Sequence, residues 1–293
     1  MSRILQLPLL LAAALVLGCS GTSKSAPAVP TGAGSGTTAF PTVGPPFVVP
    51  GERMTYRVTA HEMTLAAFAI EVGKPTTFHD RPSIVVHAGA EATGVAALVK
   101  PIKAEFATWL DTKNGEPLLF RVTETAGRGD ETVESNEARF TDIAEGKFPI
   151  ATKRPDGTEI LETQDLVQPQ KPIDTMTFLL ALRGWDGRDG ETHKIDVVRS
   201  RYLWRTTVEL VGRTSVVTDL GQLPAVKFAA TTARIMRDGS LDKGTDPRHF
   251  TVWVSDDADR VPLLLVAESD YGDIRMEIVD YAAGNGPNLL GAR

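Results

Sequence analysis

Hydrophobic and polar residues alternate along several short runs of this chain, which is the pattern of strands that bury one face. The runs span residues 53–58, 103–110, 201–210 and 273–278. In the first of them Met54, Tyr56 and Val58 fall on one face, and arginine or threonine falls on the other. Strands that are covered on both faces read as continuous apolar runs instead. The alternation therefore predicts a mainly β fold, with an antiparallel sheet that has one solvated side.

Turn-forming residues separate these runs. Asn-Gly or Asp-Gly pairs lie at 114–115, 156–157 and 238–239. Such pairs tolerate the positive φ angles that a tight reversal requires. The clearest hairpin is predicted over residues 250–267, where two apolar runs flank an acidic turn at 256–259. We expect Trp253, in the first strand of this hairpin, to be largely buried in the core.

One helix is predicted. Asp174 can cap a helix over residues 175–183, and Gly184 provides a C-terminal stop. Four of the nine residues in that run are Phe or Leu, so we expect the helix to pack against the concave side of the sheet. No internal repeat of about 20 to 50 residues occurs, which disfavours a solenoid or a propeller.

The first 18 residues have the layout of a signal peptide. Arg3 is their only charge, and the mainly apolar run at 4–17 is shorter than the roughly 20 residues that cross a bilayer. The run ends in Val-Leu-Gly-Cys at 16–19, which resembles the bacterial lipobox, where the cysteine is lipidated and becomes the mature N-terminus. Cys19 is the only cysteine of the chain, so we expect it to be lipidated. The alternative is a plain secretory signal with an accidental cysteine.

A flexible linker is expected after the cysteine. Of the 27 residues from 20 to 46, 23 are Gly, Pro, Ser, Thr or Ala, and such a segment cannot bury a core. Ser20 replaces the aspartate that retains lipoproteins in the inner membrane of enteric bacteria. We therefore expect an outer-membrane lipoprotein that is held by its acyl chains and faces the periplasm, with exposure at the cell surface left open. The predicted division of the chain is a signal peptide (1–18), the lipidated cysteine and linker (19–46), a β-rich domain (47–283) and a tail (284–293).

Composition and charge disfavour several classes of function. A net charge of -6 without a Lys/Arg-rich run argues against nucleic acid as a partner. A single cysteine excludes an intramolecular disulfide and a multi-cysteine zinc site. The Walker A, GxGxxG, HExxH and GxSxG motifs do not occur, and no nucleophile–base pair stands out. We therefore expect no catalysis, no cofactor and no metal site.

Two polar clusters can be interpreted either as binding sites or as ordinary structural features. The three aspartates at 256–259 have the chemistry to hold calcium, but the flanking strands demand a turn there and aspartate is a preferred turn residue. We favour the turn. Arg199, Arg201 and Arg205 are expected to share one strand face, where they would meet lipid phosphates or glycan carboxylates, or would simply be solvated.

Three separated motifs resemble a known bacterial family. They are Pro-Gly-Glu-Arg-Met-Thr-Tyr-Arg-Val at 50–58, Trp-Val-Ser-Asp-Asp-Ala with Arg-Val-Pro-Leu at 253–263, and Ser-Asp-Tyr-Gly-Asp-Ile at 269–274. In this order they resemble the bacterial domain of unknown function 3108, whose members are exported proteins of Gram-negative bacteria. The resemblance covers residues 47–283 and implies an envelope location, but no activity. At 64–68 the sequence departs from the Gly-rich turn that the family usually has after its first strand.

The Trp-turn-Pro-Leu hairpin is also similar to that of periplasmic lipoprotein carriers, whose open, curved sheets wrap helices and hold acyl chains. This likeness implies a curved antiparallel sheet or half-open β-barrel with one short packed helix. We therefore expect a non-enzymatic outer-membrane lipoprotein that binds an apolar or amphiphilic envelope ligand, such as a lipid, in a half-barrel cavity. The residues expected to line that cavity, or else to fill the core, are Phe106, Phe178, Tyr202, Trp204 and Phe228. The alternative is a structural or assembly factor that binds envelope proteins or glycan through its surface.

Overall fold

The computed structural model describes residues 40, 47–99, 101–126, 132–167, 170–269 and 272–285. The predicted signal peptide, Cys19, all of the predicted linker except Phe40, and residues 286–293 of the tail lie outside the described residues. The strands are β1 (Arg53–Ala60), β2 (Met63–Phe78), β3 (Arg81–Ala92), β4 (Ile102–Asp111), β5 (Pro117–Ala126), β6 (Thr132–Arg139), β7 (Lys147–Lys153), β8 (Glu159–Asp165), β9 (Ile173–Asp174), β10 (Thr192–Arg199), β11 (Tyr202–Thr218), β12 (Gly221–Arg234), β13 (Arg248–Ser255), β14 (Pro262–Ala267) and β15 (Ile274–Ala282). The helical elements are α2 (Gly94–Val99), α3 (Thr175–Gly184) and the 3-10 helix η1 (Phe140–Asp142).

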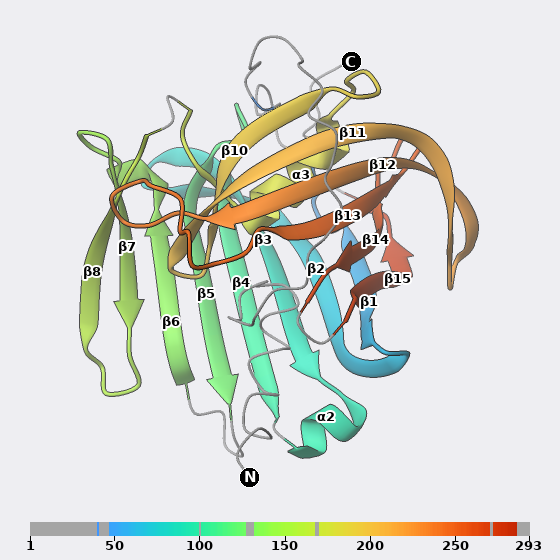
Figure 1. Cartoon of the computed structure of the whole chain (residues 1–293), viewed down its shortest axis with the longest axis horizontal. Helices are drawn as coiled ribbons and strands as arrows, with labels where there is room; N and C mark the ends of the chain where they lie inside the picture. Colours follow the sequence, from blue (N-terminus) through green and yellow to red (C-terminus); the bar gives the residue numbers. More distant parts are fainter. Residues whose placement is uncertain are drawn as a thin grey trace.

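All 15 strands form one open sheet, in the order β8-β7-β6-β5-β4-β3-β2-β1-β15-β14-β13-β12-β11-β10-β9. Neighbouring strands are antiparallel except β9 and β10, which are parallel. The sheet curls around α3, which contacts β10 and β4 from its two halves (Figure 1). Strands β8 and β9 are its two edges, so it does not close into a barrel. The predicted fold class is confirmed, and α2 is a second short helix that the alternation did not predict.

The predicted strand faces are buried as expected. Met54, Tyr56 and Val58 of β1 lie in the core, as do Ile274 and Met276 of β15, which pairs with β1. This pairing joins the first strand in the chain to the last, at the middle of the sheet, so the N-terminal and C-terminal halves share one continuous interior. Burying each large apolar side chain contributes roughly 1.5 to 3 kcal/mol, which makes the concave interior the main source of stability.

The helix α3 begins where its cap was predicted. Asp174 Oδ1 accepts hydrogen bonds from the backbone N–H groups of Met176 and Thr177, at 2.8 and 3.0 Å. The same oxygen accepts one from the Thr108 hydroxyl of β4, at 2.9 Å. The carboxylate therefore caps the helix and ties its first turn to the opposite part of the sheet. The predicted helix and its N-cap are confirmed.

The predicted hairpin is also present, as β13 and β14. Its tryptophan is not in the core, however. Val252 and Val254 are buried, and Trp253 between them lies on the other face of the strand, half-buried, with the Lys227 ammonium 5.5 Å from its ring centre. Trp253 is thus only partly buried and packs against the core from the other face of the strand, because the strand alternation gives the inward positions to the two valines.

The reversal between β1 and β2 has no glycine. His61 and Glu62 take positive φ angles of 47° and 63°, and they bring the chain back as β2 within two residues. Residues 64–68, where the sequence departs from the usual pattern of its family, simply continue as strand β2. The turn is therefore a tight hairpin whose backbone strain is carried by ordinary L residues.

Phe40 belongs to the segment that was predicted to be a linker, yet its side chain is fully buried. Its ring stacks on Phe178 of α3 with centroids 5.6 Å apart, and it lies edge-on to Trp185 and His193. At this residue the folded body begins before the expected boundary at Phe47. The small residues around Phe40 in the sequence gave no signal that this ring would pack among aromatic side chains.

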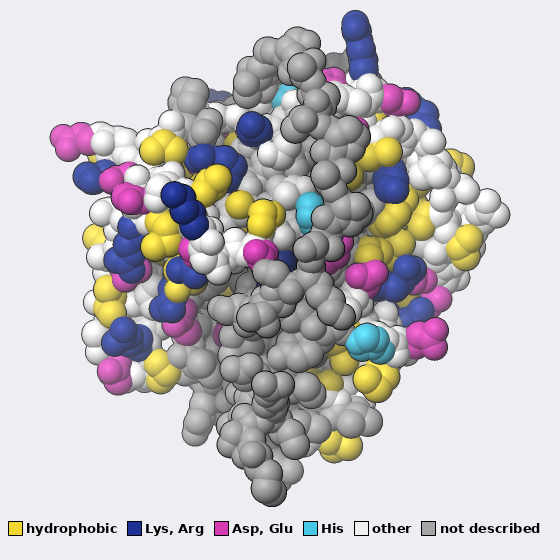
Figure 2. All heavy atoms as spheres, viewed as in Figure 1, with side chains coloured by type: hydrophobic (Ala, Val, Ile, Leu, Met, Phe, Trp, Pro, Cys, Tyr) yellow, Lys and Arg dark blue, Asp and Glu magenta, His cyan; other side chains and the backbone are white. Residues whose placement is uncertain are grey.

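Acidic and basic side chains are intermixed on the face shown in Figure 2, over strands β6 to β8. Arg121 and Arg139 both pair with Glu137, and Lys147 pairs with Asp165 across β7 and β8. Exposed pairs of this kind contribute little to stability. In the part of the chain that the structure describes, no helix has the length and apolar character needed to cross a membrane.

Candidate ligand pocket

A pocket of about 60 Å³ lies between α3 and the concave face of strands β10 to β15. It is lined by Thr175, Met176, Phe178, Leu179, Val197, Arg199, Thr206, Thr232, Phe250, Val252, Leu265 and Met276. Most of these side chains are apolar, because α3 presents its buried face to the inward positions of the strands. The pocket therefore lies inside the half-open sheet, beside the helix that the sheet surrounds.

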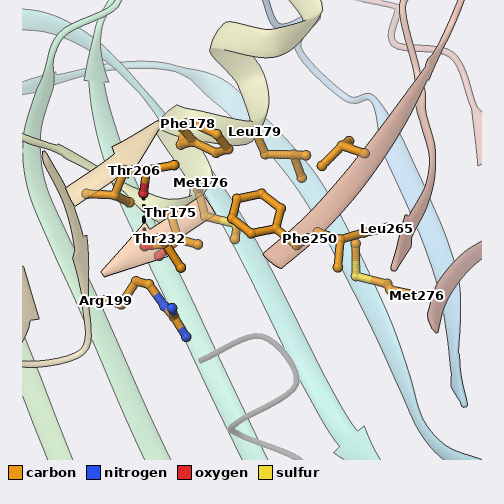
Figure 3. Close-up of a pocket in the computed structure, with 12 residues that line it drawn as sticks. Thr175, Met176, Phe178, Leu179, Arg199, Thr206, Thr232, Phe250, Leu265 and Met276 are labelled. Carbon is orange, nitrogen blue, oxygen red and sulfur yellow. Dashed lines mark hydrogen bonds between the residues drawn. The ribbon is translucent and has the colours of Figure 1, made fainter. Parts of the chain in front are cut away.

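The polar and apolar lining residues are separated within this pocket (Figure 3). Thr206, Thr232 and Arg199 lie on one side, whereas Leu179, Leu265 and other apolar side chains lie on the other. The hydroxyl groups of Thr206 and Thr232 are hydrogen-bonded to one another at 3.1 Å. The pocket thus has an amphipathic lining, with a cationic group at its polar end.

Arg199 is the charged residue of this lining, and only 5% of it is exposed. Its guanidinium carbon lies 4.6 Å from the ring centre of Trp204, a cation–π contact. Its Nη2 atom is buried and has no hydrogen-bond partner among the residues that the structure describes. Burial lowers the pKa of Arg199 to about 9, so the group remains a cation at neutral pH.

The five residues expected to line a cavity are not brought together. Phe178 lines the pocket, and Trp204 lies behind Arg199. Phe106 and Phe228 are buried elsewhere in the core, where Phe106 packs on Phe68 and Phe228 on Trp185, with ring centroids 6.4 and 5.3 Å apart. Tyr202 lies in a second cleft. Whether any of the five contacts a ligand stays a prediction.

That second cleft has a volume of about 470 Å³ and lies between the ends of β7 and β8 and the segment after β12. The Arg234 guanidinium stacks on the Tyr202 ring at 3.9 Å, and Arg201 lies 5.1 Å from the same ring. Arg237 pairs with Glu162 at its rim. The cationic groups here are partly exposed and engaged with ring or carboxylate partners, so this cleft is a polar surface feature.

The three arginines expected on one strand face are divided between two faces. Arg199 ends β10 and points inward, in the same alternation as Ile195 and Val197. Arg205 of β11 lies on the opposite face and pairs with Asp196 at 3.0 Å. The expectation was wrong because a tight reversal separates Arg199 from Arg201, so the residues belong to two strands. The period-two run at 195–199 was the signal that would have placed Arg199 inside.

The aspartates at 256–259 form a hydrogen-bonded turn. Asp257 Oδ1 accepts bonds from the Ser255 hydroxyl and from the backbone N–H groups of Asp259 and Arg260, at 2.7, 3.0 and 3.0 Å. Asp256 forms an ion pair with Arg213 at 3.2 Å. These bonds agree with the favoured interpretation of the cluster as a turn. Among the described residues, no group of three or more His, Cys, Asp or Glu side chains is placed to hold a metal ion.

The model of the family "Protein of unknown function (DUF3108)" matches residues 54–279, which is most of the described body. The chain belongs to this family. The resemblance that its motifs predicted is thereby confirmed, and the matched range begins in β1 and ends in β15. No curated protein matches the chain.

Among solved structures, the chain is similar to a β-barrel-like protein of the domain of unknown function DUF1849 from Brucella abortus. The TM-score is 0.51 at 12% identity, and the match covers 80% of this chain and 98% of that one. A likeness at this identity shows the fold alone.

Two further matches have lower scores. A Bacteroides fragilis protein described as exported, with a YmcC-like fold, has a TM-score of 0.34 at 8% identity, over 82% of this chain and 99% of that one. The hypothetical lipoprotein YmcC from Escherichia coli has a TM-score of 0.26 at 8% identity, over 80% and 90%. Scores this low support no argument about function.

Proposed function

We propose that this protein is a non-enzymatic outer-membrane lipoprotein that faces the periplasm and binds an apolar or amphiphilic envelope ligand in the pocket between α3 and the concave sheet. The observation that carries the proposal is the pocket itself, with its apolar lining and one cationic side chain. Protein interiors are close-packed, so a space with an apolar lining and one cationic end calls for an occupant.

The size of the pocket limits what it holds in this conformation. A volume of about 60 Å³ accepts a few water-sized groups, which corresponds to a short stretch of an acyl chain. Phe250 and Leu265 of the lining are only partly buried. A longer chain would require these two side chains to rotate outward, since both pack against the core and Phe250 lies edge-on to Phe178 of α3.

The buried carboxylates support a binding role over a catalytic one, since structural bonds engage them. Asp174 caps α3 and receives the Thr108 hydroxyl. Glu52 is paired with Arg183. Neither group lines the pocket. The lining itself holds threonine hydroxyls and Arg199 but no acid or histidine that would serve as a general base.

The predicted lipidation of Cys19 supplies the membrane anchor in this proposal, and the linker would set the distance between the anchor and the domain. The linker would hold the pocket in the periplasm, close to the membrane surface. An apolar ligand would then be bound within reach of the membrane that anchors the protein.

The test is displacement of a neutral fluorescent probe, N-phenyl-1-naphthylamine, from delipidated protein. Wild type should bind it saturably and release it when dodecanol is added. Leu265→Trp should weaken this binding at least tenfold, because the larger ring fills the pocket. Val266→Trp, one residue along β14 and on the opposite face, is the matched control and should bind as wild type does.

Absence of saturable binding by folded wild type would overturn the proposal, as would equal binding by the two tryptophan variants. Either result would favour the alternative function, an assembly factor that binds envelope proteins or glycan through its surface. Circular dichroism of each variant verifies that the sheet is intact.

A further inference from the structure

We propose that the ligand of this pocket is an anionic amphiphile and that Arg199 binds its head group. The inference rests on the proposed function, because it names the chemistry of a ligand in the same pocket. It adds the charge of the ligand, the end of the pocket at which the head lies, and the residue that recognises it.

The three arginines that are buried among the described residues differ in the partners of their guanidinium groups. Arg183 donates to the Glu52 carboxylate and to two backbone carbonyls. Arg260 donates to the backbone carbonyls of Arg183 and Trp185. Arg199 is as buried as Arg260, but among the described residues it has only the Trp204 ring as partner. A buried cation without a counter-charge is costly, so its presence in a pocket points to an anion that arrives from outside.

The N-terminal segment of the chain does not provide that counter-charge. Residues 1–51 contain no aspartate or glutamate, so no side chain of the signal peptide or linker can neutralise Arg199. Within the pocket lining the other polar side chains are threonines, which carry no charge. Among the described residues, the pocket lining therefore offers Arg199 no anionic partner, and we expect a ligand to supply one.

The geometry assigns the two ends of such a ligand. Arg199 lies at the polar end, below Thr232 in the view of Figure 3, with its guanidinium directed away from Phe178. The face of the guanidinium is held by Trp204, which leaves its N–H edge to donate to oxygen atoms. An apolar tail would extend from there along Leu179 and the other apolar lining residues.

Carboxylates and phosphate monoesters share the chemistry that this edge recognises, since both present two or more charged oxygen acceptors. A fatty acid and a phospholipid-type lipid are thus two sources of one ligand chemistry. A neutral amphiphile with the same tail would occupy the apolar end alone, and a cationic one would be repelled. This order of preference is what the experiment measures.

The experiment uses displacement of N-phenyl-1-naphthylamine from the full-length, delipidated protein by four ligands with the same 12-carbon chain, each below its micellar concentration. They are laurate, dodecyl phosphate, dodecanol and dodecyltrimethylammonium. Wild type should bind at least one of the two anions about tenfold or more tightly than dodecanol, the size expected of a charge-assisted hydrogen bond. Tighter binding of laurate would indicate a fatty acid, and tighter binding of dodecyl phosphate a phospholipid-type ligand.

Three variants locate the charge. Arg199→Met should bring the anion-to-dodecanol affinity ratio close to one and leave dodecanol binding within about twofold, whereas Arg199→Lys should keep most of the preference. Arg201→Met removes an arginine that also lies over an aromatic ring, Tyr202, but outside the pocket, and should change nothing. A purely structural role for Arg199 would alter all four affinities together.

The outcomes separate the two proposals. If dodecanol and the probe bind but the anions bind no better, the assignment of Arg199 is wrong and the apolar pocket stands. If the anion preference survives in Arg199→Met, the head group lies elsewhere and the assignment is again wrong. If folded wild type binds neither the probe nor any of the four ligands, the proposed function itself fails, and this inference fails with it.

Discussion

Arg183 of α3 and Glu52, which are 131 residues apart in the sequence, form a bidentate ion pair inside the protein, with N–O distances of 2.8 and 2.6 Å. Arg183 also donates to the backbone carbonyls of Asp259 and Arg260. The Tyr281 hydroxyl donates to Glu52 at 3.2 Å. The pair therefore joins the segment before β1, the end of α3, the β13–β14 turn and β15.

Two of the motifs that identify the family meet at this ion pair. The motif at 50–58 contributes Glu52 and, through Tyr56, a hydrogen bond to the carbonyl of Pro262 at 3.0 Å. The motif at 253–263 contributes the turn that receives Arg183. Burial raises the pKa of Tyr56, so its hydroxyl stays protonated and remains a donor. These separated motifs thus form one buried network of polar bonds at the end of α3, which we call the Glu52–Arg183 network.

Replacing Glu52 tests how much the Glu52–Arg183 network contributes to stability. Glu52→Gln should lower the free energy of unfolding by about 3 to 5 kcal/mol, because it leaves the Arg183 cation buried without a counter-charge. The double variant Glu52→Gln, Arg183→Met should recover part of that loss. Urea denaturation of the four proteins gives the coupling energy. Glu71→Gln, which removes an exposed pair with Arg53, is the control and should cost less than about 1 kcal/mol. If Glu52→Gln and Glu71→Gln lowered the free energy of unfolding equally, the stabilising role of the Glu52–Arg183 network would be contradicted.

The Asp174 cap should make stability depend on pH in a defined direction. Burial raises the pKa of the Asp174 carboxyl, against the hydrogen bonds from Thr177, Thr108 and Met176 that lower it. A raised pKa in the folded state stabilises the protein below the ordinary value of 3.8, and this contribution is lost as pH rises through the raised pKa. The free energy of unfolding of wild type, relative to Asp174→Asn, should therefore fall between pH 4 and neutral pH.

Chemical denaturation of both proteins across that range checks the sign, and a difference that grows with pH would contradict it. Asp174→Ala serves as the companion variant. It removes the acceptor at every pH, so relative to Asp174→Asn it should cost about 1 to 2 kcal/mol at every pH, the usual size of a lost N-cap.

Arg199→Met should stabilise the ligand-free protein. The substitution removes a buried cation that has no carboxylate partner among the described residues, and it keeps an apolar stem of similar length. We expect the melting temperature to rise by about 2 °C or more. The same change at Arg183 should lower it, since Glu52 would then be left unpaired. Differential scanning calorimetry of delipidated protein distinguishes the two, and a loss of stability in Arg199→Met would show that this guanidinium has a structural role.

Phe40→Ala should destabilise the domain by about 3 to 5 kcal/mol, the cost of emptying an aromatic site in a core. N-terminal trimming provides a second measurement. A chain that starts at residue 40 should melt as the longer protein does, whereas one that starts at residue 47 should melt several degrees lower. If the two trimmed chains had the same melting temperature, Phe40 would not contribute to the stability of the folded domain.

Cys19→Ser should release the protein from the membrane or leave its precursor unprocessed, because the anchor in this proposal is the acylated cysteine. Fractionation of cells that express each form, followed by mass spectrometry of the N-terminus, checks this. Processed variant protein that still sediments with membranes, as wild type does, would show that another part of the chain holds it there.

Local patterns in the sequence determined much of this fold. Alternation predicted strands such as β1 and β15, the acidic turn predicted the β13–β14 hairpin, and Asp174 predicted the start of α3. Each of these features depends on residues within a few positions of one another, where backbone geometry and capping act without help from the rest of the chain.

Tertiary structure decided which side chains meet inside the sheet, and what space the interior leaves. Trp253 was expected inside and Arg199 outside because residue type was given more weight than position in the strand alternation, which puts Val252, Val254 and Arg199 on inward faces. The partner of Glu52 lies 131 residues away, and Phe40 finds its aromatic neighbours on α3 and β10. A pocket is the space that remains after all these side chains have packed. It depends on contacts between distant segments, and no short stretch of the sequence specifies it.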